Sequence, residues 1–183
     1  GMGKNKLQAE LGINKLQAEE LFKQYHSKVP FVKQLMDAVM DRAQRKGKVR
    51  TLLGRLCRFH LWEPNQFGIH KPLPHDDALA EHGPGIRRAY TYKALNRLIQ
   101  GSAADIIRRA MIAMQPVLKK KSPKSRMLLQ VHDELIFEAP ESETDNLIQN
   151  VREVMQNACA PRLSLSVPLV VEAQAAKNWD EAH

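Results

Sequence analysis

The stretch MLLQVHDELIFE, residues 127–138, decides the fold of this chain. Two short apolar runs flank the polar triplet His132-Asp133-Glu134. Apolar runs of this length, separated by polar residues, are typical of paired strands joined by a turn. We therefore expect an antiparallel hairpin that carries the polar triplet at or beside its turn.

Helical segments are expected on both sides of this hairpin. Residues 86–118 contain no proline before Pro116 and are followed by KKKSP. Residues 141–159 are amphipathic, and their acidic first turn suits the positive end of a helix dipole. Leu165–Glu172 is expected to be a last strand. The order helix, hairpin, helix, strand predicts an α+β lobe with an antiparallel sheet.

The N-terminal residues are expected to form helices that end before residue 48. Asn14 can cap a helix whose apolar residues recur at helical spacing: Leu16, Leu21, Phe22 and Tyr25. A second helix is expected to begin at Pro30 and to stop at Gly47.

Residues 49–85 are expected to connect this helical part to the second lobe. Residues 49–62 have the pattern of a hairpin that turns near Gly54. Residues 63–85 are rich in proline, histidine and glycine, which indicates a loop and the boundary between two lobes. The expected parts are therefore residues 1–85, with helices, hairpin and loop, and residues 86–183.

The charge of the chain is sorted along the sequence. The 28 basic and 20 acidic residues give a formal net charge of +8. Residues 86–128 carry 11 basic and 1 acidic side chains, whereas residues 129–183 carry 3 basic and 10 acidic ones. This division suggests a polyanion-binding surface beside a different kind of site. Charge runs that are only solvated helix faces would explain it equally well.

Several classes of protein are excluded by composition. Hydrophobic residues make up 43% of the chain, which is enough for a packed core. The sequence has no run of about 18 apolar residues, so no membrane partner is expected. The N-terminus lacks the apolar region of a secretory signal. Cys57 and Cys159 stand far apart in the sequence, which favours free thiols and a cytoplasmic location.

Two groups of residues have side chains suited to chemistry on nucleic acids. Asp133 and Glu134 can present oxygen ligands for Mg²⁺ beside a basic surface, as two-metal phosphoryl transfer requires. An ordinary polar turn is the commoner interpretation from spacing alone. Asn96 and Gln100 lie four apart on the expected long helix, so their amides share one face and could contact a DNA groove. The alternative is a packed helix with solvated amides.

Two motifs give a specific resemblance. KALNRLIQGSAADII, residues 93–107, and LLQVHDEL, residues 128–135, resemble the palm region of DNA polymerase family A. LLGR at residues 52–55 and NWDEAH at residues 178–183 resemble further elements of these enzymes. The resemblance runs through nearly the whole chain in collinear order.

The resemblance implies roles for four residues of the hairpin. Asp133 corresponds to the motif C aspartate that binds the catalytic Mg²⁺, and Glu134 to its acidic neighbour and second metal ligand. His132, grouped with these two as a catalytic residue, and Gln130 fall where the family approaches the primer strand. DNA-directed DNA synthesis is the implied activity.

The resemblance also implies a DNA-binding group on the long helix. Asn96 and Gln100 match amides that contact the minor groove of the primer-template. Many members of the family carry an arginine where this chain has Tyr92. Lys93 and Arg97 are the two candidates to replace its charge.

The same resemblance implies partners and missing parts. The expected partners are primer-template DNA and deoxynucleoside triphosphates, with residues 1–85 part of the fingers and residues 86–183 part of the palm. No segment resembles motif A, which carries the second metal-binding aspartate, and Gly1-Met2-Gly3 would follow directly after the nucleotide-binding fingers helix unless Gly1 is a tag scar. The chain is therefore expected to be a C-terminal fragment that is inactive without an N-terminal remainder. Its incomplete sheet could also self-associate.

Two other functions stay open at this point. The first is a non-catalytic nucleic-acid-binding remnant of a polymerase, for which Asp133 would be dispensable. The second is a metal-dependent nuclease built on His132 and Asp133, for which Asp76 and Asp77 are the remaining carboxylate candidates.

Overall fold

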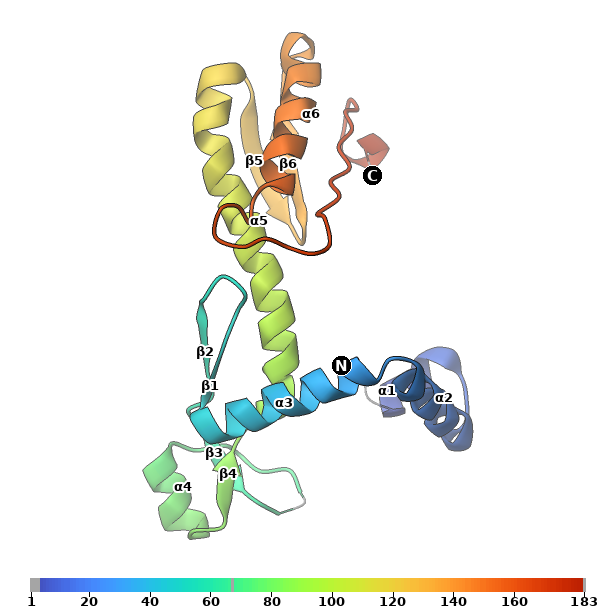
Figure 1. The fold of residues 1–183 in the computed structure, drawn as a ribbon, viewed down its shortest axis with the longest axis vertical. Coiled ribbons are helices and arrows are strands. Elements are labelled where there is room, and N and C mark those ends of the chain that lie inside the picture. Colours follow the sequence, from blue (N-terminus) through green and yellow to red (C-terminus); the bar gives the residue numbers. More distant parts are fainter. Residues whose placement is uncertain (1–3, 67, 183) are drawn as a thin grey trace. The chain divides into compact units, whose positions relative to one another are not determined.

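The chain divides into two compact units, Gly1–Gln100 and Gly101–His183. The computed structural model describes residues 4–66 and 68–182, so Gly1-Met2-Gly3 lies outside the described residues. Helix α5 (Ala94–Lys121) begins in the N-terminal unit and continues in the C-terminal unit (Figure 1). Within these residues, helices and three two-stranded antiparallel sheets give the chain the predicted α+β class.

Three helices open the N-terminal unit: α1 (Lys4–Leu11), α2 (Lys15–Lys28) and α3 (Pro30–Lys46). Asn14 caps α2 as predicted, because its side chain accepts a hydrogen bond from the backbone N–H of Gln17 at 2.9 Å. The Gln17 side chain accepts from the N–H of Asn14 at 3.0 Å, which completes a capping box. Helix α3 starts at Pro30 and stops at its C-cap Gly47, as predicted.

The first hairpin covers the core of the N-terminal unit. Strands β1 (Lys48–Arg50) and β2 (Leu56–Arg58) pair in antiparallel register, and the turn between them contains Gly54, with φ of +95°. Backbone N–H of Phe59 donates to the carbonyl oxygen of Gly47 at 2.8 Å, which ties the hairpin to the end of α3. The core residues are Val39, Ala43, Val49, Phe59 and Ala94.

Two predictions for the following segment were wrong. The expected loop contains strand β3 (Trp62–Pro64) and helix α4 (His75–His82), and the expected start of the long helix is strand β4 (Ile86–Arg88). Strand β4 pairs with β3, which joins residues on the two sides of position 85. A short 3₁₀ turn, η1 (Thr91–Lys93), then leads into α5. Pairing between segments more than 20 residues apart overrides the local helical pattern.

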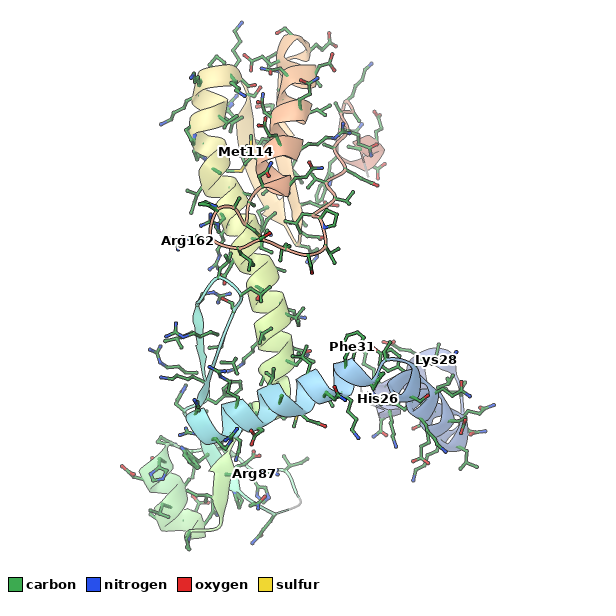
Figure 2. The ribbon with its side chains drawn as sticks, viewed as in Figure 1. His26, Lys28, Phe31, Arg87, Met114 and Arg162 are labelled. Atoms are coloured by element: carbon green, nitrogen blue, oxygen red, sulfur yellow. The ribbon has the colours of Figure 1, made fainter. Side chains whose placement is uncertain are left out.

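The C-terminal unit has the predicted helix, hairpin and helix. Strands β5 (Arg126–Val131) and β6 (Glu134–Glu138) form the hairpin, and α6 (Glu141–Gln156) follows it. Met114 of α5, labelled in Figure 2, is fully buried. It packs with Leu118, Leu147 and Val151, and Met127 and Phe137 of the hairpin close this core.

The predicted last strand, Leu165–Glu172, is wrong. This segment has no strand partner among the described residues and leaves Val167 and Val170 exposed. Strand-forming side chains do not make a strand without a ladder of hydrogen bonds. Arginine side chains hold the chain on both sides of this segment. Arg109 donates to the carbonyl oxygens of Ala158 and Ala160 at 2.7 and 2.9 Å, and Arg152 donates to that of Ala173 at 2.8 Å. A 3₁₀ turn, η2 (Asp180–Ala182), is the last described element.

Two further features bear on the sequence predictions. Cys57 and Cys159 are free thiols. Within residues 4–66 and 68–182, the helices are all too short or too polar to span a bilayer.

Candidate functional site

The turn of the β5–β6 hairpin presents the polar triplet. Val131 and Glu134 are paired across the strands, so His132 and Asp133 form a two-residue turn. His132 has φ of +51°, the positive value that such tight turns require at one or both central residues. The side-chain amide of Gln130 donates to the carbonyl oxygen of His132 and holds the turn. Gln130, His132, Asp133 and Glu134 are thus neighbours, as predicted from their spacing.

The carboxylates at this turn have the donor chemistry of a partial magnesium site. Asp133 is exposed at the turn, and Glu134 is half-buried at the start of β6. Mg²⁺ binds through one or two carboxylates together with substrate phosphates and water, so these two side chains fit the ion. In the part of the chain that the structure describes, no three His, Cys, Asp or Glu side chains converge on a metal position. The turn therefore supplies only part of a coordination shell.

A second group of predicted residues lines a hollow in the N-terminal unit. The hollow has a volume of about 300 Å³, and its lining consists of Tyr92, Lys93, Asn96, Arg97 and Gln100. Three- and four-residue spacing brings Asn96, Arg97 and Gln100 to one side of α5, and Lys93 ends η1 directly before the helix. None of the five is acidic, so the lining is positively charged. Four of the residues predicted to bind DNA are therefore brought together.

The two cations of this hollow have different surroundings. Lys93 Nζ lies 5.0 Å from the ring centre of Tyr90 and 5.6 Å from that of Tyr92. The Arg97 guanidinium donates to the carbonyl oxygen of Arg58 at 2.9 Å, and its Cζ lies 4.5 Å from the ring centre of Phe59. Lys93 is exposed, whereas Arg97 is half-buried.

Sequence reasoning missed the residues that support this hollow. Arg88 donates to the carbonyl oxygens of Gln44 at 3.2 Å and of Phe59 at 2.9 Å, and its Cζ lies 4.4 Å from the ring centre of Trp62. Tyr90, with φ of +60°, places its ring beside Lys93. The sequence feature that could have identified them is the run RRAYTYK, residues 87–93, in which basic residues stand on both sides of two tyrosines.

The carboxylates considered for a metal-dependent nuclease, Asp76 and Asp77, belong to another part of the fold. Asp76 and Asp77 lie in the first turn of α4, in the N-terminal unit, whereas His132 and Asp133 belong to the C-terminal unit. The Asp76 carboxylate is 2.8 Å from Nδ1 of its neighbour His75. This contact gives Asp76 a local role at the helix start.

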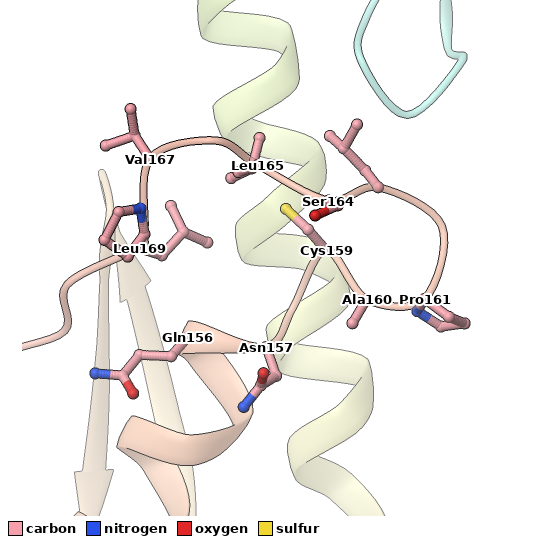
Figure 3. A pocket seen from close by; sticks show the side chains of 11 residues that line it. Gln156, Asn157, Cys159, Ala160, Pro161, Ser164, Leu165, Val167 and Leu169 are labelled. Carbon is pink, nitrogen blue, oxygen red and sulfur yellow. The ribbon is translucent and has the colours of Figure 1, made fainter.

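The C-terminal unit has a hollow of its own (Figure 3). Its volume is about 270 Å³, and its lining residues are Gln156, Asn157, Cys159, Ala160, Pro161, Leu163, Ser164, Leu165, Val167, Pro168 and Leu169. No charged side chain and no predicted site residue is among them. The residues that match the expected chemistry therefore lie at the β5–β6 turn and in the hollow of the N-terminal unit.

Known proteins with similar sequences are DNA polymerases. The model of DNA polymerase family A matches residues 1–181. DNA polymerase I of Bacillus subtilis is 39% identical over 176 residues, which are 96% of this chain and 18% of that protein. DNA polymerase I of Rhizobium leguminosarum is 37% identical over 176 residues, 95% of this chain and 16% of that protein. The chain thus spans less than a fifth of the length of these relatives.

A solved structure agrees in fold and sequence. The polymerase domain of Pol1 from M. smegmatis, in complex with DNA primer-template and dNTP, matches with a TM-score of 0.77 and 35% identity. The match covers 100% of this chain and 28% of that one. The predicted resemblance is confirmed, and the chain belongs to DNA polymerase family A.

Proposed function

We propose that this chain forms part of the active site of a DNA-directed DNA polymerase, which adds nucleotides to a primer on a DNA template. The observation that carries the proposal is the β5–β6 turn, where Asp133 and Glu134 lie side by side and Gln130 fixes the backbone of His132. A rigid turn places a charged group more reproducibly than a mobile loop does.

The residues of the turn have distinct roles in this proposal. Asp133 and Glu134 hold magnesium, which supplies charge neutralisation for phosphoryl transfer when it is bound. Asp133 is the principal ligand because its side chain is exposed at the turn. Gln130 holds the turn, and His132 faces the primer strand. The proposed order of importance for activity is therefore Asp133 first and Gln130 after it.

The hollow of the N-terminal unit binds the primer-template in this proposal. Asn96 and Gln100 expose amides that both donate and accept hydrogen bonds, as groove-edge contacts require. Lys93 and Arg97 make the lining positive, which attracts phosphates. Support comes from the M. smegmatis structure, which was determined with primer-template and dNTP. DNA and deoxynucleoside triphosphates are accordingly the proposed partners.

The second metal-binding carboxylate comes from a separate segment. The described residues bring no third carboxylate, histidine or cysteine to Asp133 and Glu134. The two-stranded sheet formed by β5 and β6 has open edges among the described strands, and Leu128 and Leu129 of β5 are more than half exposed. Such an edge can pair with a segment that carries motif A, or with a second copy of this chain. The 183 residues alone are therefore proposed to be inactive.

Primer extension tests this proposal. The chain is mixed with Mg²⁺, primer-template and all four deoxynucleoside triphosphates, with and without a polymerase fragment that carries motif A but lacks the β5–β6 turn. We expect extension only when both polypeptides are present. Extension by this chain alone would contradict the proposed division of the carboxylates, and binding of DNA without extension in any mixture would contradict the enzymatic role.

A binding-only role is the second candidate function. The observation that favours it is the partial metal site, since two carboxylates do not hold two ions for catalysis. This role predicts salt-dependent DNA binding by the hollow and complete indifference to the loss of Asp133. The Asp133 variants described below therefore separate the two candidates.

A further inference from the structure

We infer that Lys93, held beside the rings of Tyr90 and Tyr92, is the residue that carries positive charge from this hollow to a phosphate of the DNA strand. Arg97 is a positioning residue, which fixes α5 to the β1–β2 hairpin. The inference rests on the proposed function, because it assigns roles within the surface proposed to bind DNA.

The surroundings of Lys93 prepare it for an external anion. Its Nζ lies within 6 Å of two aromatic ring centres, the range in which a ring face attracts a cation. Ring faces restrict the ammonium group but leave its charge intact, whereas a carboxylate would neutralise it. A side chain that is already restricted loses less conformational entropy when it binds its ligand.

The backbone before α5 places the two rings. Tyr90 has φ of +60°, a left-handed value that costs free energy in a bulky residue and persists only where neighbours hold it. Two backbone hydrogen bonds do so: N–H of Ala89 donates to the carbonyl oxygen of Leu61, and N–H of Lys93 to that of Tyr90, both at 2.9 Å. The rings of Tyr90 and Tyr92 then meet edge to face with their centres 6.5 Å apart. The pair of rings is therefore a built feature of the β4–α5 junction.

Arg97 has fixed partners inside its own unit. Its guanidinium donates to the carbonyl oxygen of Arg58 and lies over the ring of Phe59, which is only 3% exposed. Turning this group toward a phosphate would break both contacts and leave a carbonyl without its donor. Arg97 thus stabilises the wall of the hollow, and Lys93 supplies the charge that is available to a ligand.

The chemistry of the lining specifies the ligand as a sugar-phosphate strand. Lys93 pairs with one phosphate, and Tyr92, with 63% of its surface exposed, offers a ring face for the adjoining deoxyribose or base. The amide of Asn96 lies about one helical turn beyond Lys93, and that of Gln100 about two turns beyond it, in the same lining.

Salt dependence of binding tests the inference. The affinity of the 183-residue chain for a fluorescent primer-template is measured between 50 and 200 mM salt. Each phosphate contact contributes about 0.9 to the slope of log affinity against log salt, so Lys93→Gln is expected to lower the slope by about 0.9. This corresponds to a roughly eightfold loss of affinity at 0.1 M salt. Lys15→Gln, a change at an exposed lysine on α2, is the matched control and should leave the slope unchanged.

Variants of the partners separate charge from packing. Arg97→Gln is expected to lower the melting temperature and to leave the slope of log affinity against log salt at the wild-type value. Arg97→Lys keeps the positive charge and should leave the slope at this value as well. Tyr90→Leu should weaken binding about threefold with an unchanged slope, whereas Tyr90→Phe should bind like wild type.

The outcomes distinguish this inference from the proposed function. A lower slope for Arg97→Gln together with a wild-type slope for Lys93→Gln would overturn the inference while leaving DNA binding intact. Absence of any salt-dependent binding by the wild-type chain would overturn both.

Discussion

The β5–β6 turn and the hollow of the N-terminal unit differ in how far each site is assembled. In the hollow, the cation Lys93 has two aromatic neighbours, and Arg97 ties the helix to the β1–β2 hairpin. At the turn, the side chains of Asp133 and Glu134 are placed by the backbone, and no third ligand from the described residues joins them.

This difference separates binding from catalysis. A surface for one strand of DNA needs charge and hydrogen-bonding groups on one face, and a single helix with its neighbours provides them. A two-metal site needs carboxylates from more than one segment, because each ion must be neutralised and bridged. The chain should therefore bind DNA by itself and require a partner for chemistry.

The largest expected effect is at the turn. Asp133→Asn removes a negative charge from the proposed metal site with almost no change in shape. A metal ion contributes several kcal/mol to transition-state stabilisation, and about 1.4 kcal/mol is tenfold in rate, so extension by the assembled polypeptides should fall at least about 100-fold. Asp145→Asn, which changes an exposed carboxylate of α6, is the control and should retain activity. Equal activity of the two variants would favour the binding-only role.

The next effect concerns the core that supports the turn. Met114 of α5 is fully buried against Leu147 and Val151 of α6, so Met114→Ala should cost about 2–5 kcal/mol of unfolding free energy. Denaturant titration measures this loss, and Ile112→Ala, at a site that is 72% exposed, should cost far less. In Met114→Ala, we also expect hydrogen exchange to become faster at residues 130–134 than at the residues that line the hollow. Equal losses for the two variants would show that the core is not built around Met114.

A smaller effect is expected at the end of α3, which supports the hollow. Gly47 has φ of +63°, and an added Cβ would lie 2.7 Å from Cζ of Arg88. Gly47→Ala should therefore cost about 1–3 kcal/mol, because backbone strain adds to the displacement of Arg88 from its two carbonyl partners. Gly12→Ala is a close control, since Gly12 has φ of +62° but open space around it. Equal costs in thermal unfolding would exclude a contribution from Arg88.

The smallest effect should leave both sites intact. Asn14→Ala removes the capping box of α2 and is expected to lower stability by about 1 kcal/mol. Asn14→Ser keeps a capping oxygen and should lose only a part of this amount. Both variants should bind primer-template with the wild-type salt slope. A change in that slope would show that α2 contributes to the binding surface.

Elements fixed by local chemistry were predictable from the sequence. Asn14, Pro30 and Gly47 mark helix ends through their own backbone preferences, and the structure confirms all three positions. The β5–β6 hairpin was predictable because two short apolar runs flank a two-residue turn. The grouping of Asn96 and Gln100 follows from their four-residue spacing on α5.

Features that depend on distant partners were not predictable. Residues 86–88 were expected to be helical, but pairing of Trp62 with Arg88 makes them a strand. Leu165–Glu172 has strand-forming residues but no pairing partner among the described strands. The different surroundings of Lys93 and Arg97 likewise depend on contacts with Tyr90 and Phe59, and the spacing of residues in the sequence does not predict these contacts.

Paramagnetic broadening by Mn²⁺ is the most direct test of Asp133 as a metal-binding carboxylate. Amide resonances of the isotopically labelled chain are recorded during titration with Mn²⁺ alone, for the wild type, Asp133→Asn and Asp145→Asn. We expect broadening centred on residues 131–134 in the wild type and in Asp145→Asn, and its loss in Asp133→Asn. Unchanged broadening at the turn in Asp133→Asn, or broadening centred on Asp76 and Asp77 instead, would contradict the assignment.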